Sequence, residues 1–216
     1  MPETRLAAAR SAILDAALPL AAAEGWTRSV LDRATQAAAV DAPLAARAFP
    51  RGPRDLVAAL FTRADGIAES ELAVRNIAAL RVPERIALAV RLWFAAMAPH
   101  RIALGRAAAV HATDPASAAR SLWRTADALW RGIGDTSADF AYYTKRASLA
   151  AILAATFVVW RDDGTETHWE AFLSRRLAEA GALGRTRRRV GAAAQGAARG
   201  AAAILRGLPR FRPGAP

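Results

Sequence analysis

The spacing of apolar residues is the feature that most restricts what this chain can fold into. Apolar side chains recur at positions i, i+3, i+4 and i+7, as at Ile13, Ala16, Ala17 and Leu20. Alanine and leucine dominate these segments, runs of β-branched residues are short, and no Asn-Gly hairpin signal occurs. Glycine and proline separate one segment from the next, with breaks that include Phe49 to Pro53, Val82-Pro83 and Thr113 to Pro115. Thr136 with Asp139, and Thr167 with Glu170, are expected to cap the helices that follow them. The chain is therefore expected to be all-α, with about nine helices.

The most apolar segment is too short to cross a membrane. Ala147 to Trp160 is fourteen residues long and includes Ser148 and Thr156, whereas a membrane-spanning helix needs about 20 apolar residues. We expect a buried core helix here, with a polar start at Asp139 to Arg146.

The sequence lacks the residues that several classes of chemistry require. The sequence has no cysteine, and His100, His111 and His168 are not spaced like metal ligands. No nucleophile lies at motif spacing from a base, and no glycine-rich phosphate loop is present. We therefore expect no enzymatic activity, no metal and no cofactor, and we expect acids such as Asp163 to be solvated. Asp15 and Glu24 interrupt any signal-peptide segment, which predicts a cytoplasmic protein.

The net charge of +11 is concentrated at one end of the chain. Residues 182–216 contain eight of the 30 basic residues and no acid, which leaves 22 basic and 19 acidic residues in the rest of the chain. A positive tail of this kind favours binding to an anionic surface.

The tail also has the pattern of a basic amphipathic helix. A helical wheel places Val190, Ile204, Leu205 and Leu208 on one side, opposite arginines that can face anionic lipid. The alternative is a disordered basic end or a nonspecific nucleic-acid tether. The predicted membrane-binding residues are Arg188, Val190, Arg199, Ile204, Leu205, Arg206 and Leu208.

In the first sixty residues a predicted helix from Arg5 to Ala23 is followed by "SVLDRATQAAAV" and "DAPLAARAFP". This arrangement resembles the helix-turn-helix of the TetR family of regulators. The resemblance implies a TetR-like fold with a recognition helix at Asp41 to Phe49. That helix offers Arg47 as its one strong donor and begins with an acid, and Ala39 replaces the turn glycine of the family. We expect the fold without specific DNA binding, and a TetR-type regulator with a hydrophobic pocket is the alternative.

The second half resembles a different family. "SLWRTADALWRGIGDTSADFAYYTKRASLAAILAATFVVWRDD", followed by "THWEAFLSRRLAEA", is similar to the ubiquinone-biosynthesis accessory proteins of the Coq-nine family. Trp130, Gly134-Asp135, Asp139-Phe140 and Tyr143 to Arg146 carry the match. The resemblance implies a lipid-binding protein. The TetR-like fold indicates a homodimer, and 29 arginines against one lysine favour a bacterial source. With its basic tail, the protein is expected on the inner face of the cytoplasmic membrane. It would bind an isoprenoid quinone intermediate and present it to the ring hydroxylase.

Two sets of site residues follow from this resemblance. The expected partner-binding residues lie at the polar start of the helix, where Ala141-Tyr142-Tyr143 replaces the Asn-Trp-Tyr of the family, and they are Asp139, Tyr142, Tyr143, Lys145 and Arg146. For the lipid set, bulky side chains on several helices alternate with alanines, although a plain core is the alternative for each residue taken alone. The expected lipid-binding residues are Trp93, Phe94, Met97, Trp123, Trp130, Leu149, Ile152, Leu153, Thr156, Phe157 and Trp160.

These observations predict three regions. Residues 1–52 form a helix-turn-helix-like unit, 53–181 a helical lipid-binding domain, and 182–216 the membrane-binding tail. A scaffold whose core holds no ligand is a further alternative.

Overall fold

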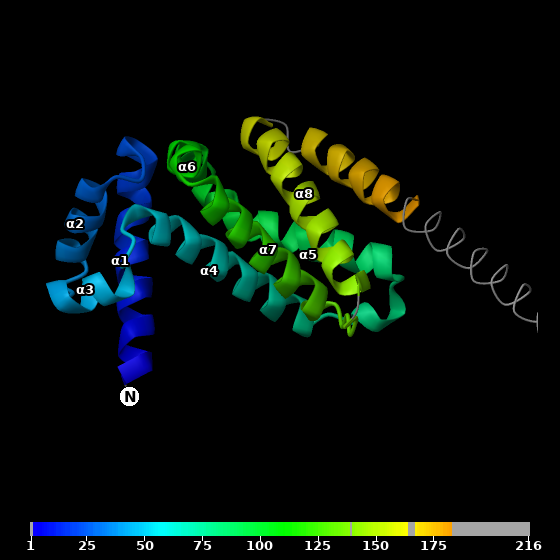
Figure 1. Cartoon of the computed structure of the whole chain (residues 1–216), viewed down its shortest axis with the longest axis horizontal. Helices are drawn as coiled ribbons and strands as arrows, with labels where there is room; N and C mark the ends of the chain where they lie inside the picture. Colours follow the sequence, from blue (N-terminus) through cyan, green and yellow to red (C-terminus); the bar gives the residue numbers. More distant parts are fainter. Residues whose placement is uncertain (1, 139, 164–166, 183–216) are drawn as a thin grey trace, which may run out of the picture.

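The computed structural model describes residues 2–138, 140–163 and 167–182, and within these ranges the chain is helical and contains no strand. The all-α prediction is confirmed. The expected total of about nine helices includes one in residues 183–216, which lie outside the described part, so that number stays a prediction. The described α-helices are α1 (Pro2–Glu24), α2 (Arg28–Ala37), α3 (Ala42–Ala48), α4 (Pro53–Ala73), α5 (Val82–Met97), α6 (Arg101–Thr113), α7 (Pro115–Gly132) and α8 (Phe140–Asp162), and residues 168–182 are also helical (Figure 1).

The helix boundaries follow local chemistry. Thr27 caps α2 by accepting from the Val30 N–H, and Asp41 caps α3 by accepting from the Leu44 N–H. Asp114 caps α7 in the same way, with Pro115 in the first turn, where its missing N–H costs no bond. α4 begins at Pro53, α5 at Val82 and α7 at Pro115, so the predicted breaks before these three helices are confirmed. A short 3-10 helix, η1 (Ile77–Ala79), also lies between α4 and α5, and a second, η2 (Ala98–His100), separates α5 from α6.

One of the expected helix caps is wrong. Thr136 was expected to cap the next helix together with Asp139, but α8 begins at Phe140, four residues after Thr136, and Asp139 lies outside the described residues. Thr167 and Glu170 were expected to form a capping box for residues 168–182, and that box stays a prediction. The Trp169 N–H of the same helix donates to Asp163 Oδ2 at 2.9 Å, a bond that helical spacing did not indicate.

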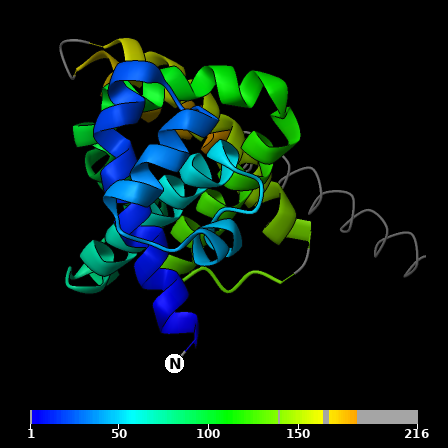
Figure 2. The ribbon, with the colours of Figure 1, turned by 90° about the vertical axis from the view of Figure 1, so that its left-hand side faces the viewer.

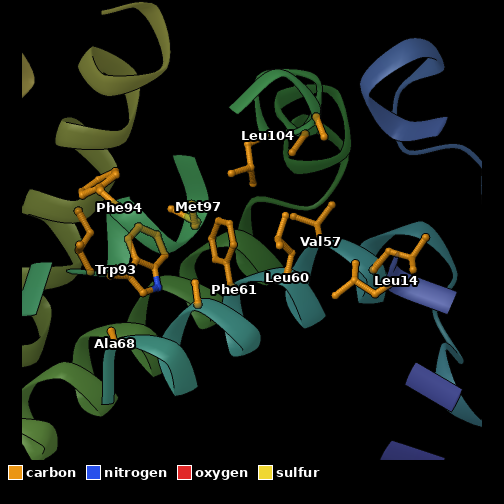
Figure 3. Packing of buried hydrophobic residues seen from close by; sticks show 14 of the residues in the cluster. Leu14, Val57, Leu60, Phe61, Ala68, Trp93, Phe94, Met97 and Leu104 are labelled. Carbon is orange, nitrogen blue, oxygen red and sulfur yellow. The ribbon is translucent and has the colours of Figure 1, made fainter. Parts of the chain in front are cut away.

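The helices pack around one continuous core. α1 packs against α2, α3 and α6, while α4 packs against α5 and α7, and α7 packs against α8. Figure 2 shows α1 and the two short helices that follow it from the side facing away from α8. In Figure 3 the buried side chains form a layer that runs from Leu14 through Leu60 and Phe61 to Trp93 and Phe94. The N-terminal helices and the predicted lipid-binding helices therefore share this core.

Two stretches of the described residues, Glu3–Glu24 and Val82–Ala107, are long and apolar enough to cross a membrane by length and composition alone. A core helix passes the same test, and here Trp93, Phe94 and Met97 of the second stretch are completely buried in the protein. The second stretch is also interrupted by η2. The segment of α8 from Ala147 to Trp160 is not among these stretches.

Candidate functional site

The polar start of α8 is built around a buried arginine. The Arg146 side chain is 1% exposed and donates from Nε to Asp127 Oδ1 at 2.6 Å and from Nη1 to Asp135 Oδ2 at 3.2 Å. Its guanidinium also lies 3.5 Å from the centre of the Tyr142 ring, and the Tyr142 hydroxyl donates to the same Asp127 oxygen. Arg146 therefore ties α8 to the C-terminal half of α7.

Lys145 completes this network on the outer side. Its Nζ donates to Asp135 Oδ1 at 2.5 Å and to Ser137 Oγ at 2.6 Å, and it lies 5.1 Å from the Trp130 ring centre. The Trp130 Nε1–H donates to the Lys145 carbonyl at 3.2 Å. The Lys145 side chain is one-third exposed, so Lys145 lies at the edge of the network.

The turn between α7 and α8 places Asp135 in this network. Gly134 has φ +86, a conformation that glycine adopts without a steric penalty. The Gly134 and Asp135 N–H groups donate to carbonyls at the end of α7 and close that helix. The Gly134-Asp135 pair thus has a structural role.

The carboxylates of the network are held in the ionised form. Partial burial raises the pKa of Asp127, but the hydrogen bonds from Arg146 and Tyr142 outweigh that effect and lower the pKa below its ordinary value. The pKa of Asp135 is lowered for the same reason, since the bonds from Lys145, Ser137 and Arg146 outweigh the effect of burial. The pKa of Arg146 is raised, because its two carboxylate partners outweigh burial.

This geometry changes the interpretation of the predicted partner-binding residues. Arg146 is inside the protein, so a partner cannot reach its guanidinium, and Asp139 lies outside the described residues. Tyr142 is half-buried, whereas Tyr143 is 61% exposed and lies 6.3 Å from the Trp123 ring. Phe140 is 73% exposed. We call Phe140, Tyr143 and Trp123 the aromatic patch; Phe140 was not predicted, although its position at the start of α8 could have indicated it.

Most of the predicted lipid-binding residues converge in one aromatic cluster. Phe94 lies 5.1 Å from Trp93, 5.3 Å from Trp160 and 5.1 Å from Trp169, as measured between ring centroids. Phe157 lies 5.7 Å from Trp160. Met97, Leu149, Ile152, Leu153 and Thr156 are also buried. Trp169 was not predicted, because its own helix gave no sign of which neighbour it faces.

Trp123 and Trp130 do not belong to that cluster. Trp123 contacts Tyr143, and Trp130 contacts Lys145. Both tryptophans are only partly buried. The predicted lipid set thus divides into a buried cluster around Phe94 and two tryptophans near the polar start of α8.

The sequence did not predict the buried acid that lies beside the cluster. Asp65 of α4 is 7% exposed, and its Oδ1 accepts from Trp93 Nε1 at 2.8 Å and from Thr125 Oγ1 at 2.7 Å. Burial raises the pKa of Asp65 to about 6, although both hydrogen bonds and the charge of Arg124 act in the opposite direction. The burial of the Asp65 carboxylate inside the helical body therefore disfavours its charged form.

Two further polar groups border the cluster. Asp163, expected to be solvated, is 6% exposed, and its carbonyl accepts from Arg101 Nη1 at 2.7 Å. The Arg101 guanidinium lies 4.4 Å from the Trp160 ring centre. Thr156 is completely buried, and its hydroxyl has no hydrogen-bond partner within the described part of the chain. A buried hydroxyl without a partner costs about 1–3 kcal/mol.

Two hollows lie elsewhere in the protein. A cavity of about 490 Å³ is bordered by α1, α4 and the α3–α4 turn, and one of about 280 Å³ lies between α2 and α3. Neither is lined by a residue of the predicted lipid set. In the described ranges, no three histidine, aspartate or glutamate side chains are grouped to hold a metal ion. The seven predicted membrane-binding residues, Arg188 to Leu208, lie outside those ranges.

Comparison with known proteins shows a family resemblance for one segment of the chain. A search of curated proteins gave no match. The COQ9 family model matches residues 116–184, a segment that runs from α7 through α8 to the helical residues 168–182. This segment contains both the buried Arg146 network and the α8 side of the aromatic cluster. Residues 116–184, which are 69 of the 216 residues, are therefore similar to the COQ9 family.

Proposed function

We propose that this protein is an accessory, lipid-binding protein of ubiquinone biosynthesis that binds an isoprenoid quinone intermediate and presents it to the ring hydroxylase at the membrane. The observation that carries the proposal is the COQ9 match over residues 116–184, since membership of this family supports a role in ubiquinone biosynthesis. COQ9 is an accessory family, which favours assistance over catalysis.

The aromatic cluster supports the lipid-binding part of the proposal. Apolar groups from α5, α8 and residues 168–182 meet at Phe94. Transfer of isoprenoid carbon into such a site gains about 0.8 kcal/mol per CH₂ group. Because Trp93, Leu153 and Trp160 are almost completely buried, a lipid would enter only if α8 or residues 168–182 moved away from α5.

The Thr156 hydroxyl supports a ligand with a polar head. It is buried in the cluster without a partner among the described residues, and a quinone carbonyl is an acceptor that it could bind. Such a bond would recover the cost of burying the hydroxyl. Thr156 would then orient the ring, while the surrounding apolar groups would contact the isoprenoid chain.

The aromatic patch supports the contact with the hydroxylase. Exposed aromatic rings are typical of the central residues of protein interfaces. Phe140 and Tyr143 are exposed on α8, and the buried Arg146 network beneath them fixes that helix turn. The patch would meet the enzyme, and Arg146 would act only by holding the patch in place.

The basic tail of residues 182–216 would bring the protein to anionic lipid on the inner face of the bacterial membrane. Its eight arginines would each gain about 1 kcal/mol near such a surface. A homodimer is part of the proposal, because dimers are common among proteins with TetR-like helices.

The N-terminal helices favour a TetR-like arrangement without DNA recognition. α2, the turn at Ala39 and α3 follow α1 in that order and pack against it. On α3 the exposed residues include Ala42, Pro43, Ala46 and Arg47, and Asp41 pairs with Arg5 at 3.1 Å. One guanidinium is a poor set of donors for phosphates and base edges, which supports lipid binding over transcriptional regulation.

The test is to identify any lipid that co-purifies with the full chain from a ubiquinone-producing host. Native mass spectrometry of the protein, followed by extraction, should detect one isoprenoid quinone or precursor per chain. Thr156→Val keeps the shape but removes the hydroxyl, so it should retain less quinone while melting at the same or a higher temperature. Thr144→Val, at a hydroxyl that donates to the Phe140 carbonyl on the same helix, is the matched control. Absence of isoprenoid lipid from a fully helical preparation would refute the lipid-binding function.

A further inference from the structure

The larger cavity has no residue of the predicted lipid set in its lining. Its volume is about 490 Å³, and it is bordered by α1, α4 and the turn that joins α3 to α4, with one residue of α7. A cavity of this size falls within the range of small-molecule sites. Leu14, Phe49 and Ala59 give it an apolar wall.

The same cavity has four arginines in its lining. Two of them are neutralised, since Arg51 binds Asp55 at 2.7 Å and Arg63 binds Asp15 at 2.5 Å. The other two, Arg10 and Arg124, come from α1 and α7. The four residues are far apart in the sequence, so no local motif could have indicated this group.

Arg10 and Arg124 retain an unbalanced charge. Arg10 Nε donates to the Ala48 carbonyl at 3.1 Å, and Arg124 Nη2 donates to the Ala58 carbonyl at 3.2 Å. Among the described residues, neither guanidinium is hydrogen-bonded to a carboxylate. The positive charge of Arg124 acts to lower the pKa of Asp65. The Asp65 side chain is buried, however, and its Oδ1 already accepts from Trp93 and Thr125.

The backbone bonds fix both guanidinium groups but use few of their donors. A guanidinium has five N–H donors in a planar fork that matches the oxygens of a carboxylate or phosphate. Each of these two arginines uses one donor on a backbone carbonyl. The remaining donors belong to residues that line the same cavity as Leu14, Phe49 and Ala59.

We propose that this cavity binds a small anionic molecule, with its carboxylate or phosphate group on Arg10 and Arg124 and an apolar or aromatic body against Leu14, Phe49 and Ala59. The site is separate from the proposed lipid site and does not depend on it. It lies where the N-terminal helices meet the helical body, so a bound anion would link α1 to α7.

The experiment is isothermal titration of the full chain in 150 mM salt with phenyl phosphate, benzoate and neutral benzamide. Phenyl phosphate or benzoate should bind once per chain, at least about tenfold more tightly than benzamide, because benzamide cannot form charge-assisted bonds. The two anions distinguish a phosphate site from a carboxylate site. Equal, weak binding of all three probes would overturn the proposal.

Matched variants separate the cavity from the general positive charge of the chain. Arg124→Gln and Arg10→Gln should each weaken anion binding about tenfold. Arg120→Gln removes the same charge one turn away on α7, outside the cavity lining, and should have little effect. If all three variants weaken binding equally, the anion is held by diffuse charge and the assignment fails.

A second pair tests the shape of the site without changing charge. Ala7 is exposed and lines the cavity, whereas its neighbour Ala8 is exposed and does not. Ala7→Phe should fill the entrance and abolish binding, while Ala8→Phe should leave it unchanged. Circular dichroism and melting temperature should match the unaltered protein in both cases. Undiminished binding by a folded Ala7→Phe variant would contradict the location.

Discussion

Replacement of Asp65 by asparagine tests whether the buried charge of Asp65 lowers the free energy of unfolding. Both donors to this side chain, Trp93 Nε1 and Thr125 Oγ1, are bonded to the same oxygen, Oδ1. An asparagine carbonyl at that position can accept both bonds. The substitution therefore removes the ionisable group while it retains the contacts between α4, α5 and α7.

The magnitude follows from the pKa of Asp65, which burial raises from 3.8 to about 6. An acid that binds its proton more tightly in the folded state lowers the free energy of unfolding as the pH rises from about 4 to about 6. A difference of about two units corresponds to about 3 kcal/mol at neutral pH. Asparagine has no such dependence, so Asp65→Asn should become progressively more stable than the unaltered protein, by up to about 3 kcal/mol at pH 7.5.

The assay is urea unfolding followed by circular dichroism at pH 4.5, 5.5, 6.5 and 7.5, at constant ionic strength. Comparison of the two proteins at each pH cancels groups that titrate in both, including Asp127 and Asp135. Glu71→Gln removes an exposed acid of the same helix and should give a difference that varies little with pH. A stability difference for Asp65→Asn that is the same at pH 4.5 and 7.5 would show that the carboxyl is not held at a raised pKa.

The other predictions concern single side chains and the tail. Ala39 has φ +51, which costs an L-residue about 1 kcal/mol, so Ala39→Gly should raise the free energy of unfolding by about 0.5–1 kcal/mol in urea unfolding; a decrease would contradict the strain. Arg146→Leu leaves the Asp127 and Asp135 carboxylates without their buried partner and should destabilise by about 3 kcal/mol, whereas an unchanged melting temperature would show the network to be unimportant. Tyr143→Ala should leave stability within about 0.5 kcal/mol, since the residue is 61% exposed, but should reduce capture of the quinone-ring hydroxylase in a pull-down; full capture would remove Tyr143 from the interface. A chain that ends at residue 182 should keep its helicity and lose flotation with anionic liposomes, and equal flotation of the long and short chains would assign membrane binding to the helical body.

The sequence by itself determined the helices and most of their boundaries. Thr27, Asp41 and Asp114 act through bonds to N–H groups within three residues, and Pro53 and Pro115 act through their own rings, so their effects are local. Gly134 at the end of α7 is equally local, because its positive φ is a property of one residue. The resemblance of residues around α7 and α8 to the Coq-nine family was also visible in the sequence and is matched by the family model.

Only the tertiary structure decided which charged side chains are buried and what they contact. Arg146 and Lys145 are neighbours in the sequence, yet Arg146 is enclosed by acids of α7 and the following turn while Lys145 reaches solvent. Asp65 and Asp163 were indistinguishable from solvated acids, because the donors to their carboxylates lie on other helices: Thr125, which donates to Asp65, lies 60 residues away, and the Trp169 N–H donates to Asp163. Helical periodicity indicates which side of a helix is buried but not which helix covers it, and the energy of a charge depends on that neighbour.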